Sequence, residues 1–302
     1  MPHDGFLNLI KPPGMTSHDL VAWIRTCLRI KRAGHLGTLD PAAAGVLPVS
    51  IGRATRLFRF AGGPDKAYRA EVIFGISTDT LDAEGRVLSV RDSTDLTEDA
   101  LRHLLTGFVG EIKQVPPAFS AARVGGRRLH ELARDGELRE GRPRGVKIAA
   151  LELLDFLPGR SARALIDVVC STGTYVRVLA HDLGRAAGCG AYLGFLVRTR
   201  AGRFELCDAL TIDEFAAACD EEQQNELPLP LDWPLQHLPK ADLAADAARA
   251  FVQGTRVCAG DSPAWPVRVY GPGHSFLGLG EVIAKGQLSP RVVLASQGSS
   301  QP

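Results

Sequence analysis

One carboxylate in the first fifty residues has a setting that suits chemistry. Asp40 lies in the stretch 34–49, GHLGTLDPAAAGVLPV, between a polar half and an apolar half. Pro41 fixes its own φ and drives Asp40 toward an extended conformation, while the three glycines of the stretch can adopt backbone angles closed to other residues. A carboxylate presented in this way can act as a nucleophile or accept a proton. The pattern is equally typical of a loop aspartate that caps the following turn through its side chain.

Several stretches match one enzyme family in order. The 34–49 loop resembles the catalytic motif of the tRNA pseudouridine-55 synthases, in which a GH-GTLDP-A-GVLP pattern carries the nucleophilic aspartate. Residues 5–17, GFLNLIKPPGMTS, resemble the KPxGxTS segment with which that family opens. The chain is therefore identified as a member of this family. The resemblance implies that Asp40 acts on a flipped-out uridine at position 55 of the tRNA T loop and converts it to pseudouridine. Further segments that resemble the family follow to about residue 297, namely 52–57, 66–85, 110–121, 170–177, 190–202 and 276–291.

The resemblance also implies a binding pocket for the target base. The tyrosine of the family's K-Y-x-A/V element, Tyr68, would lie against the base, and a ring there supplies the stacking surface that an extruded base needs. The family's C-x-x-G-T-Y-x-R motif supplies a second tyrosine, Tyr175, and Leu196 would line the pocket. His35 would fill the vacated space or pair with a neighbouring nucleotide. Without the resemblance, the same residues are typical of core or rim positions and of an ordinary loop histidine.

The same C-x-x-G-T-Y-x-R motif places Arg177 beside the catalytic aspartate of the family. A buried carboxylate stays ionised at neutral pH only if a cation or hydrogen-bond donors offset its desolvation. An arginine cannot deprotonate, so it can serve that role without joining proton transfer. We therefore expect Arg177 to pair with a buried Asp40.

Basic residues gather in two stretches that could contact RNA phosphates. Cations at positions 25, 29, 31 and 32 follow a predicted helix and lead into the 34–49 loop, where they could instead complement the helix C-terminus. Residues 123–147 hold eight cations against four acidic residues, and such mixed charge is also typical of a solvated face. In the family this second region is a mobile thumb that closes on the tRNA arm. We predict that the RNA backbone is contacted by Lys11, Arg32, Arg127, Arg128 and Arg134.

The hydrophobic pattern predicts an α+β fold. It indicates helices over 17–28 (capped by Ser17), over 97–108, and from a start within 171–177 to about 187. It also indicates strands over 66–75, 164–170 and 190–202, and a short helix that begins with a capping box at 211–214. The family resemblance implies the pseudouridine-synthase fold, with a mixed, mainly antiparallel sheet flanked by helices. We expect a catalytic domain over 1–239 with an RNA-binding insertion at about 113–150, a PUA-like RNA-binding domain over 240–297, and a disordered tail over 298–302. That small, β-rich second domain is predicted from a helix at 241–253 and strands at 267–270, 276–284 and 291–295.

Composition bounds the class of protein. The 302 residues, 45% of them hydrophobic, suffice for one large and one small domain. No apolar run reaches about 18 residues, so no membrane span is expected, and the N-terminus lacks the features of a signal peptide. The six cysteines form no CxxC pair and are interpreted as buried thiols of a cytoplasmic protein. Neither a metal-ligand cluster nor a glycine-rich phosphate loop is present, so we predict no metal and no cofactor.

Two other functions fit parts of the sequence. A guide-RNA-dependent pseudouridine synthase would rely on partners to hold its RNA, whereas the arginine-rich insertion favours an enzyme that binds the tRNA T stem-loop as a monomer without a protein partner. A catalytically inactive RNA-binding protein is disfavoured by the intact Asp40, Tyr68 and Arg177.

Detachment of a base from C1′ resembles glycoside chemistry. The sequence leaves open whether Asp40 attacks C1′, assists proton loss at C2′ or adds to C6 of the ring.

Overall fold

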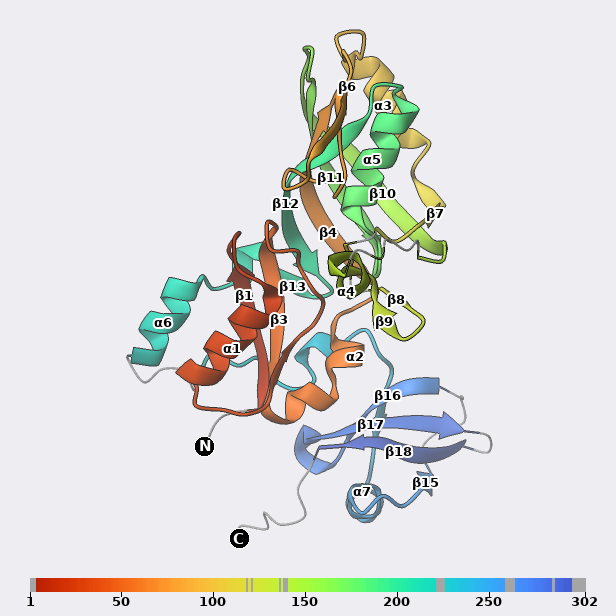
Figure 1. The fold of residues 1–302 in the computed structure, drawn as a ribbon. Helices are drawn as coiled ribbons and strands as arrows, with labels where there is room; N and C mark the ends of the chain where they lie inside the picture. The colour runs from red at the N-terminus through yellow and green to blue at the C-terminus, as the bar shows by residue number, and fades with distance from the viewer. Residues whose placement is uncertain are drawn as a thin grey trace.

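One large sheet runs through most of the chain (Figure 1). The computed structural model describes residues 4–117, 119–120, 122–135, 137, 141–220, 226–258, 264–283 and 286–294. Nine strands form the sheet, namely β1 (Gly5–Lys11), β2 (Ala33–His35), β3 (Ala44–Ile51), β4 (Asp65–Phe74), β7 (Gly110–Gln114), β10 (Arg144–Leu157), β11 (Arg163–Ser171), β12 (Ala191–Ala201) and β13 (Phe204–Glu205).

The order and direction of these strands confirm the predicted mixed sheet. The central path is β1-β3-β12-β4-β11-β10-β7, with β2 beside β3 and β13 beside β12. Among these pairings β3–β12 is parallel, and the others are antiparallel. The predicted alternation in β4 is also confirmed, because Tyr68, Ala70, Val72 and Phe74 are all buried on one face. The residue pattern of β4 therefore decides which of its side chains reach the core and the site.

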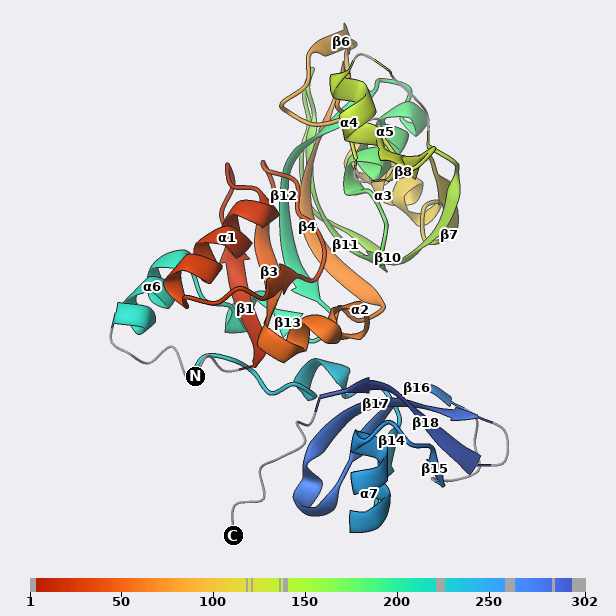
Figure 2. The same cartoon turned by 60° about the horizontal axis from the view of Figure 1, so that its bottom comes forward.

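Helices cover the sheet in two places. α3 (Glu98–Thr106) and α5 (Val176–Ala186) lie side by side where the strands from β12 to β7 curve around them (Figure 2). α1 (Ser17–Cys27) packs the apolar face formed by Leu20, Val21 and Ile24 into the core beside β1, and α6 (Ile212–Asp220) follows the capping box at Thr211. The predicted cap of α1 is wrong by one residue. Thr16 caps this helix, through a reciprocal pair of hydrogen bonds with Asp19, which leaves the next residue available for another contact.

The C-terminal part is a second, smaller sheet with one helix. Its strand order is β14-β16-β17-β18-β15, and α7 (Ala245–Val252) packs against it. The sequence did not indicate the short β14 and β15, and β16 and β18 begin three and four residues earlier than predicted. The strands are β14 (Lys240–Asp242), β15 (Val257–Cys258), β16 (Ala264–Tyr270), β17 (Phe276–Ile283) and β18 (Gln287–Val293).

Apolar and polar contacts join the two parts. The ring centroids of Phe60 and Trp265 lie 5.4 Å apart in an edge-on arrangement. Arg53 donates a hydrogen bond of 2.6 Å to the carbonyl of Leu294. A shared core cluster includes Phe204 of the large sheet and Leu279 of the small one. These contacts position the small domain beneath the large one in the view of Figure 2.

The segment inserted between strands of the large sheet is shorter than the predicted insertion at about 113–150. The range 113–150 takes in the end of β7 and the start of β10, which pair with each other in the large sheet. Between them lie a two-stranded hairpin, β8 (Arg123–Val124) and β9 (Arg127–Arg128), and α4 (Leu129–Arg134). The predicted disordered tail, 298–302, lies outside the described residues.

The remaining short elements complete the chain. Among the described residues, no helix has the length and apolar character needed to cross a membrane. The cysteines are free thiols, but Cys207 and Cys258 are exposed, so the prediction that all six are buried is wrong.

The other elements are η1 (Gly52–Arg56), α2 (Phe58–Ala61), β5 (Ile76–Thr78), β6 (Val87–Val90), η2 (Leu206–Asp208), η3 (Trp233–Leu235) and η4 (Pro272–His274).

Candidate active site

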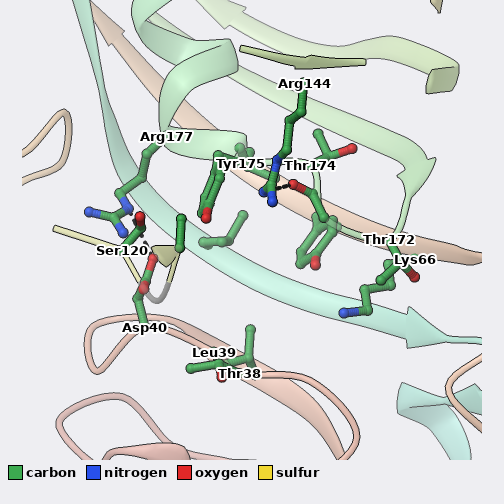
Figure 3. Close-up of a pocket in the computed structure, with 15 residues that line it drawn as sticks. Thr38, Leu39, Asp40, Lys66, Ser120, Arg144, Thr172, Thr174, Tyr175 and Arg177 are labelled. Atoms are coloured by element: carbon green, nitrogen blue, oxygen red, sulfur yellow. Dashed lines mark hydrogen bonds and ion pairs between the residues drawn. The ribbon is translucent and has the colours of Figure 1, made fainter. Parts of the chain in front are cut away.

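A cavity of about 340 Å³ opens between the Asp40 loop, β4, β12 and the start of α5 (Figure 3). Five of the residues predicted from the sequence line it together: Asp40, Tyr68, Tyr175, Arg177 and Leu196. These residues are up to 156 positions apart in the chain, from Asp40 to Leu196. The fold therefore brings these five residues into one site.

Asp40 and Arg177 form an ion pair at one side of this cavity. Arg177 Nε lies 2.9 Å from Asp40 Oδ2. The arginine side chain is 7% exposed, whereas the aspartate side chain is 44% exposed. The expected pairing is present, but the expectation of a buried Asp40 is wrong. One carboxylate oxygen is held by the guanidinium while the side chain stays open to the cavity, where a substrate atom can reach it.

The guanidinium of Arg177 has a second acidic partner that sequence reasoning missed. Its Nη1 lies 3.2 Å from Asp82 Oδ2 and 3.3 Å from the carbonyl of Thr80, and its Nη2 donates to the carbonyl of Phe119 at 3.0 Å. The Asp82 side chain is 13% exposed and also accepts a hydrogen bond from the Thr80 hydroxyl. Because all three guanidinium nitrogens are occupied, the orientation of Arg177 is set from several sides. The signal for Asp82 lay in the T-D-T-x-D run of the 75–85 segment.

This geometry predicts a kinetic effect of a substitution at Asp82. Asp82→Asn keeps the shape of the side chain but removes its charge, so Arg177 is left with Asp40 as its one carboxylate partner in the described site. We expect the single-turnover rate of any reaction that uses Asp40 to slow by about 10²-fold, as for a small misplacement of a catalytic group. Asp79→Asn is the matched control, since Asp79 lies in the same segment and pairs instead with Arg86. Equal rates for the two variants would contradict a role for Asp82 in placing Arg177.

A buried lysine holds one flank of the Asp40 loop. Lys11 is 0% exposed, and its ammonium donates to the carbonyls of Pro12, Met15 and Pro41 at 2.7, 2.7 and 3.1 Å. Burial lowers the pKa of Lys11 to about 8, although the nearby Asp40 charge acts in the opposite direction. The prediction that Lys11 contacts the RNA backbone is therefore wrong, because its ammonium is enclosed by the loop that it supports.

Ser17 anchors the residue immediately before Asp40. The Ser17 hydroxyl donates to the carbonyl of Leu39 at 3.1 Å and accepts from its backbone N–H at 2.9 Å. Thr16 caps the helix, so Ser17 is available for this contact. The expected capping role of Ser17 is thus replaced by a role in positioning the loop.

Arg198 fixes the other half of the loop from β12. It is 0% exposed, and it donates to the carbonyls of Val46, Gly37 and Thr38 at 2.7, 3.0 and 3.4 Å. Arg198 also bonds the hydroxyl of Tyr68, its cross-strand neighbour. Burial raises the pKa of Tyr68 while Arg198 opposes that rise, so the ring remains a neutral phenol at pH 7.

Tyr175 and Leu196 form further walls of the cavity. The backbone N–H of Tyr175 donates to Gln114 Oε1 at 2.9 Å, and Gln114 donates back to the Tyr175 carbonyl at 3.2 Å. Arg144 lies 4.3 Å from the centroid of the Tyr175 ring. Leu196 is 8% exposed and reaches the cavity from β12. Aromatic and aliphatic walls of this kind suit a flat heterocyclic base.

His35 lies outside the base cavity but close to it. It lines an adjoining cavity of about 640 Å³ that also contains Asp40 and Arg177. Burial, and then the charge of Arg198, lower the pKa of His35, so its imidazole is neutral at pH 7. Its Nδ1 is buried and has no hydrogen-bond partner among the described residues.

The structure describes the side chains of only some of the predicted phosphate-binding arginines. Arg32 is exposed beside the loop. Arg127 is exposed and pairs with Asp135. The side chains of Arg128 and Arg134 lie outside the described part of the chain, although their backbones belong to β9 and α4.

Three family models match consecutive parts of the chain. Residues 25–176 match the model described as TruB family pseudouridylate synthase (N terminal domain). Residues 177–236 match the tRNA pseudouridylate synthase B C-terminal domain, and residues 239–294 match Pseudouridine synthase II TruB, C-terminal.

Individual relatives agree with these models. The tRNA pseudouridine synthase B of Symbiobacterium thermophilum is 53% identical over 251 residues, which cover 83% of this chain and 82% of the relative. The protein of the same name from Gloeothece citriformis is 43% identical, and the matched region covers 96% of this chain and 97% of the relative. Among solved structures, an H/ACA RNP bound to a substrate RNA containing 2'-deoxyuridine matches with a TM-score of 0.74 and 26% identity, over 97% of this chain and 85% of that one.

Proposed function

Because the chain belongs to the TruB family of pseudouridylate synthases, we propose that it isomerises the uridine at position 55 in the T loop of tRNA to pseudouridine. The observation that carries the proposal is the 2.9 Å pair of Asp40 and Arg177 at a cavity lined by Tyr68, Tyr175 and Leu196. The cavity of about 340 Å³ has room for a single nucleotide and not for a stacked helix, so the target nucleotide must leave its stack to enter.

In this proposal Asp40 is the nucleophile. The N1–C1′ bond of the flipped uridine breaks, the uracil rotates between the aromatic and aliphatic walls, and C5 joins C1′. Asp40 attacks C1′, assists proton loss at C2′ or adds to C6, and each step requires an ionised carboxylate with an accessible oxygen. The half-exposed Asp40, oriented by Arg177, meets that requirement. Tyr68, Tyr175 and Leu196 hold the base, and His35 lies where the neighbouring nucleotides would pass.

A guide-RNA-dependent enzyme is the second candidate, since the H/ACA RNP has a similar fold. The relatives at 43% and 53% identity carry the name tRNA pseudouridine synthase B, which favours an enzyme that acts alone. The deciding experiment is to incubate the purified protein with a bare tRNA transcript and to map pseudouridine by position. Modification at position 55 alone supports the proposal, whereas activity only after addition of a guide RNA and partner proteins supports the alternative.

The proposal extends to the organisation and setting of the protein. Residues 1–239 would form the catalytic domain and residues 240–297 a PUA-like RNA-binding domain, in agreement with the separate family match to 239–294. We propose a monomer that acts in the cytoplasm without a protein partner or cofactor. Light scattering of the purified protein, free and bound to tRNA, tests whether it is a monomer.

Binding of tRNA should depend on the arginines of the segment between β7 and β10. We expect the triple variant Arg127→Gln, Arg128→Gln and Arg134→Gln to bind tRNA more weakly, with a salt slope lowered by about 1 for each phosphate that is no longer bound. The rate at saturating enzyme should change less. The measurement is the Kd for tRNA over a range of salt from about 50 mM to about 200 mM, where phosphate binding is strongly salt-dependent.

A second triple variant controls for net charge. Arg102, Arg160 and Arg163 lie near the other end of the large sheet, where Arg163 pairs with Ile73 at the far end of β4. Their replacement by glutamine removes the same charge at a distance from the site. If both triple variants keep the salt slope of the wild type, the segment is a solvated face and not a phosphate-binding surface.

A further inference from the structure

One buried cation at the cavity has no partner among the described residues. Lys66 lies on β4 at 8% exposure and lines the same cavity as Asp40. Its ammonium makes no hydrogen bond or ion pair with any residue in the described ranges. The other buried cations of the site differ in this respect, because Lys11, Arg177 and Arg198 each contact at least three oxygen atoms.

The described groups that face Lys66 do not supply a counter-ion. Arg198 on β12 lies close to Lys66, because both side chains approach Gly37 and the charge of Arg198 lowers the pKa of Lys66. Cys170 faces it from β11, and burial raises the pKa of this thiol to about 11, so it is neutral. Tyr68, two residues along β4, is a neutral phenol, and Asp40 is already paired with Arg177. The site thus holds a desolvated positive charge that a bound ligand can compensate.

The position of Lys66 is complementary to that of Asp40. In Figure 3 the two side chains reach the cavity from different sides, with Tyr175 and Thr174 lying between them in the view. Lys66 and Tyr68 share one face of β4, because side chains two residues apart point the same way. A base that stacks on Tyr68 and presents its sugar to Asp40 would therefore extend toward the ammonium.

We infer, on the basis of the proposed function, that Lys66 is a further catalytic residue whose ammonium donates a hydrogen bond to a uracil carbonyl oxygen as negative charge develops on it. When the N1–C1′ bond breaks, both electrons leave with the uracil, and the charge spreads from N1 to O2 and O4. When Asp40 instead adds to C6, the electrons of the C5–C6 bond move to O4. In both routes the charge reaches a carbonyl oxygen, and Lys66 keeps its proton. The later steps form the C5–C1′ bond and release the C5 proton, and they are unchanged by this assignment.

Two substitutions test the inference. Lys66→Met keeps the unbranched side chain without its charge, and Lys66→Arg keeps the charge. We expect the single-turnover rate of Lys66→Met at saturating enzyme to fall by about 10²–10³-fold, the usual effect of removing one donor to a developing oxyanion. The Kd for tRNA should change by less than about threefold. Lys66→Arg should retain at least about a tenth of the wild-type rate, and circular dichroism establishes that both variants fold.

The dependence of the rate on pH provides a second test, because a purely structural role of Lys66 would not change that dependence. Burial, followed by the charge of Arg198, lowers the pKa of Lys66 to about 8. The active form is the ammonium, so the wild-type rate should decline as the pH rises through about 8, whereas Lys66→Arg should show no decline up to about pH 9 because arginine does not titrate there. Lys11 has a similar pKa, but it is unchanged in Lys66→Arg. A decline that persists in Lys66→Arg would therefore assign the titration to Lys11 and overturn the inference.

A third test changes the stability of the uracil leaving group. Fluorine at C5 makes the uracil anion more stable, so loss of 5-fluorouridine from a substituted tRNA should depend less on Lys66 than loss of uridine does. An equal effect of Lys66→Met on both substrates would overturn the inference, as would a weaker Kd with an unchanged saturated rate, which indicates a phosphate contact. If Lys66→Met does not fold, Lys66→Arg and the wild-type pH profile still decide. A wild type without activity on tRNA refutes the proposed function, whereas an active wild type with these negative results refutes only the role of Lys66.

Discussion

Asp40→Asn is expected to abolish turnover while the fold and the affinity for tRNA stay intact. The amide has nearly the same shape as the carboxylate but neither its charge nor its nucleophilicity. The side chain is 44% exposed, so its replacement strands no buried group apart from the Nε of Arg177, which can donate to the amide oxygen. We expect the single-turnover rate to fall by about 10⁴-fold or more, as for other essential nucleophiles.

The experiment compares Asp40→Asn with an aspartate that is paired elsewhere. Asp167→Asn is the control, because Asp167 forms an exposed ion pair with Arg69 on neighbouring strands of the same sheet. Rates at saturating enzyme, tRNA affinity and thermal unfolding are measured for both. Substantial turnover by purified Asp40→Asn would remove it as the nucleophile and direct attention to Asp82, the next carboxylate on Arg177.

Arg177→Met should lower both activity and stability. The substitution keeps much of the side-chain volume, but it leaves the Asp82 carboxylate, 13% exposed, without its cation. Removing one partner of a buried ion pair commonly costs about 3–5 kcal/mol of stability. Asp40 is also deprived of the guanidinium that orients it, so we expect the rate to fall by at least about 10³-fold, above the value of about 10² for a simple misplacement.

A double-mutant cycle separates the electrostatic role of Arg177 from packing. If the cost in stability arises from the stranded Asp82 charge, then Asp82→Asn should recover much of the stability that Arg177→Met removes. The rate should not recover, because Asp40 still lacks its partner. Arg177→Lys should restore little, since one ammonium cannot reproduce the contacts that the guanidinium makes to Asp40, Asp82 and the Phe119 carbonyl together. Strictly additive decreases in stability would indicate that Arg177 acts through packing alone.

The local features of this chain could be predicted from its sequence. The alternation in β4 determined that Tyr68 lies on the buried face, and the order of the motifs determined the family and the residues that share the site. The Thr211 capping box and the helix that follows β11 were also evident, although the first residue of that helix was not, because capping and periodicity depend on residues a few positions apart. Such patterns report which face of an element is apolar, and they hold whatever the element packs against.

The roles of the buried cations were decided only by the tertiary structure. The sequence placed Lys11 among the RNA contacts, but the fold encloses its ammonium with three carbonyls. Arg198 reaches the carbonyls of Gly37 and Thr38 from about 160 residues away, and Asp82 joins Arg177 across 95. Lys66 lies on the same strand as Tyr68, yet no described oxygen reaches it. A buried charge supports a loop when the fold brings oxygen atoms within about 3 Å of it, and it can bind a ligand when the fold does not. Residue spacing does not encode these long-range distances.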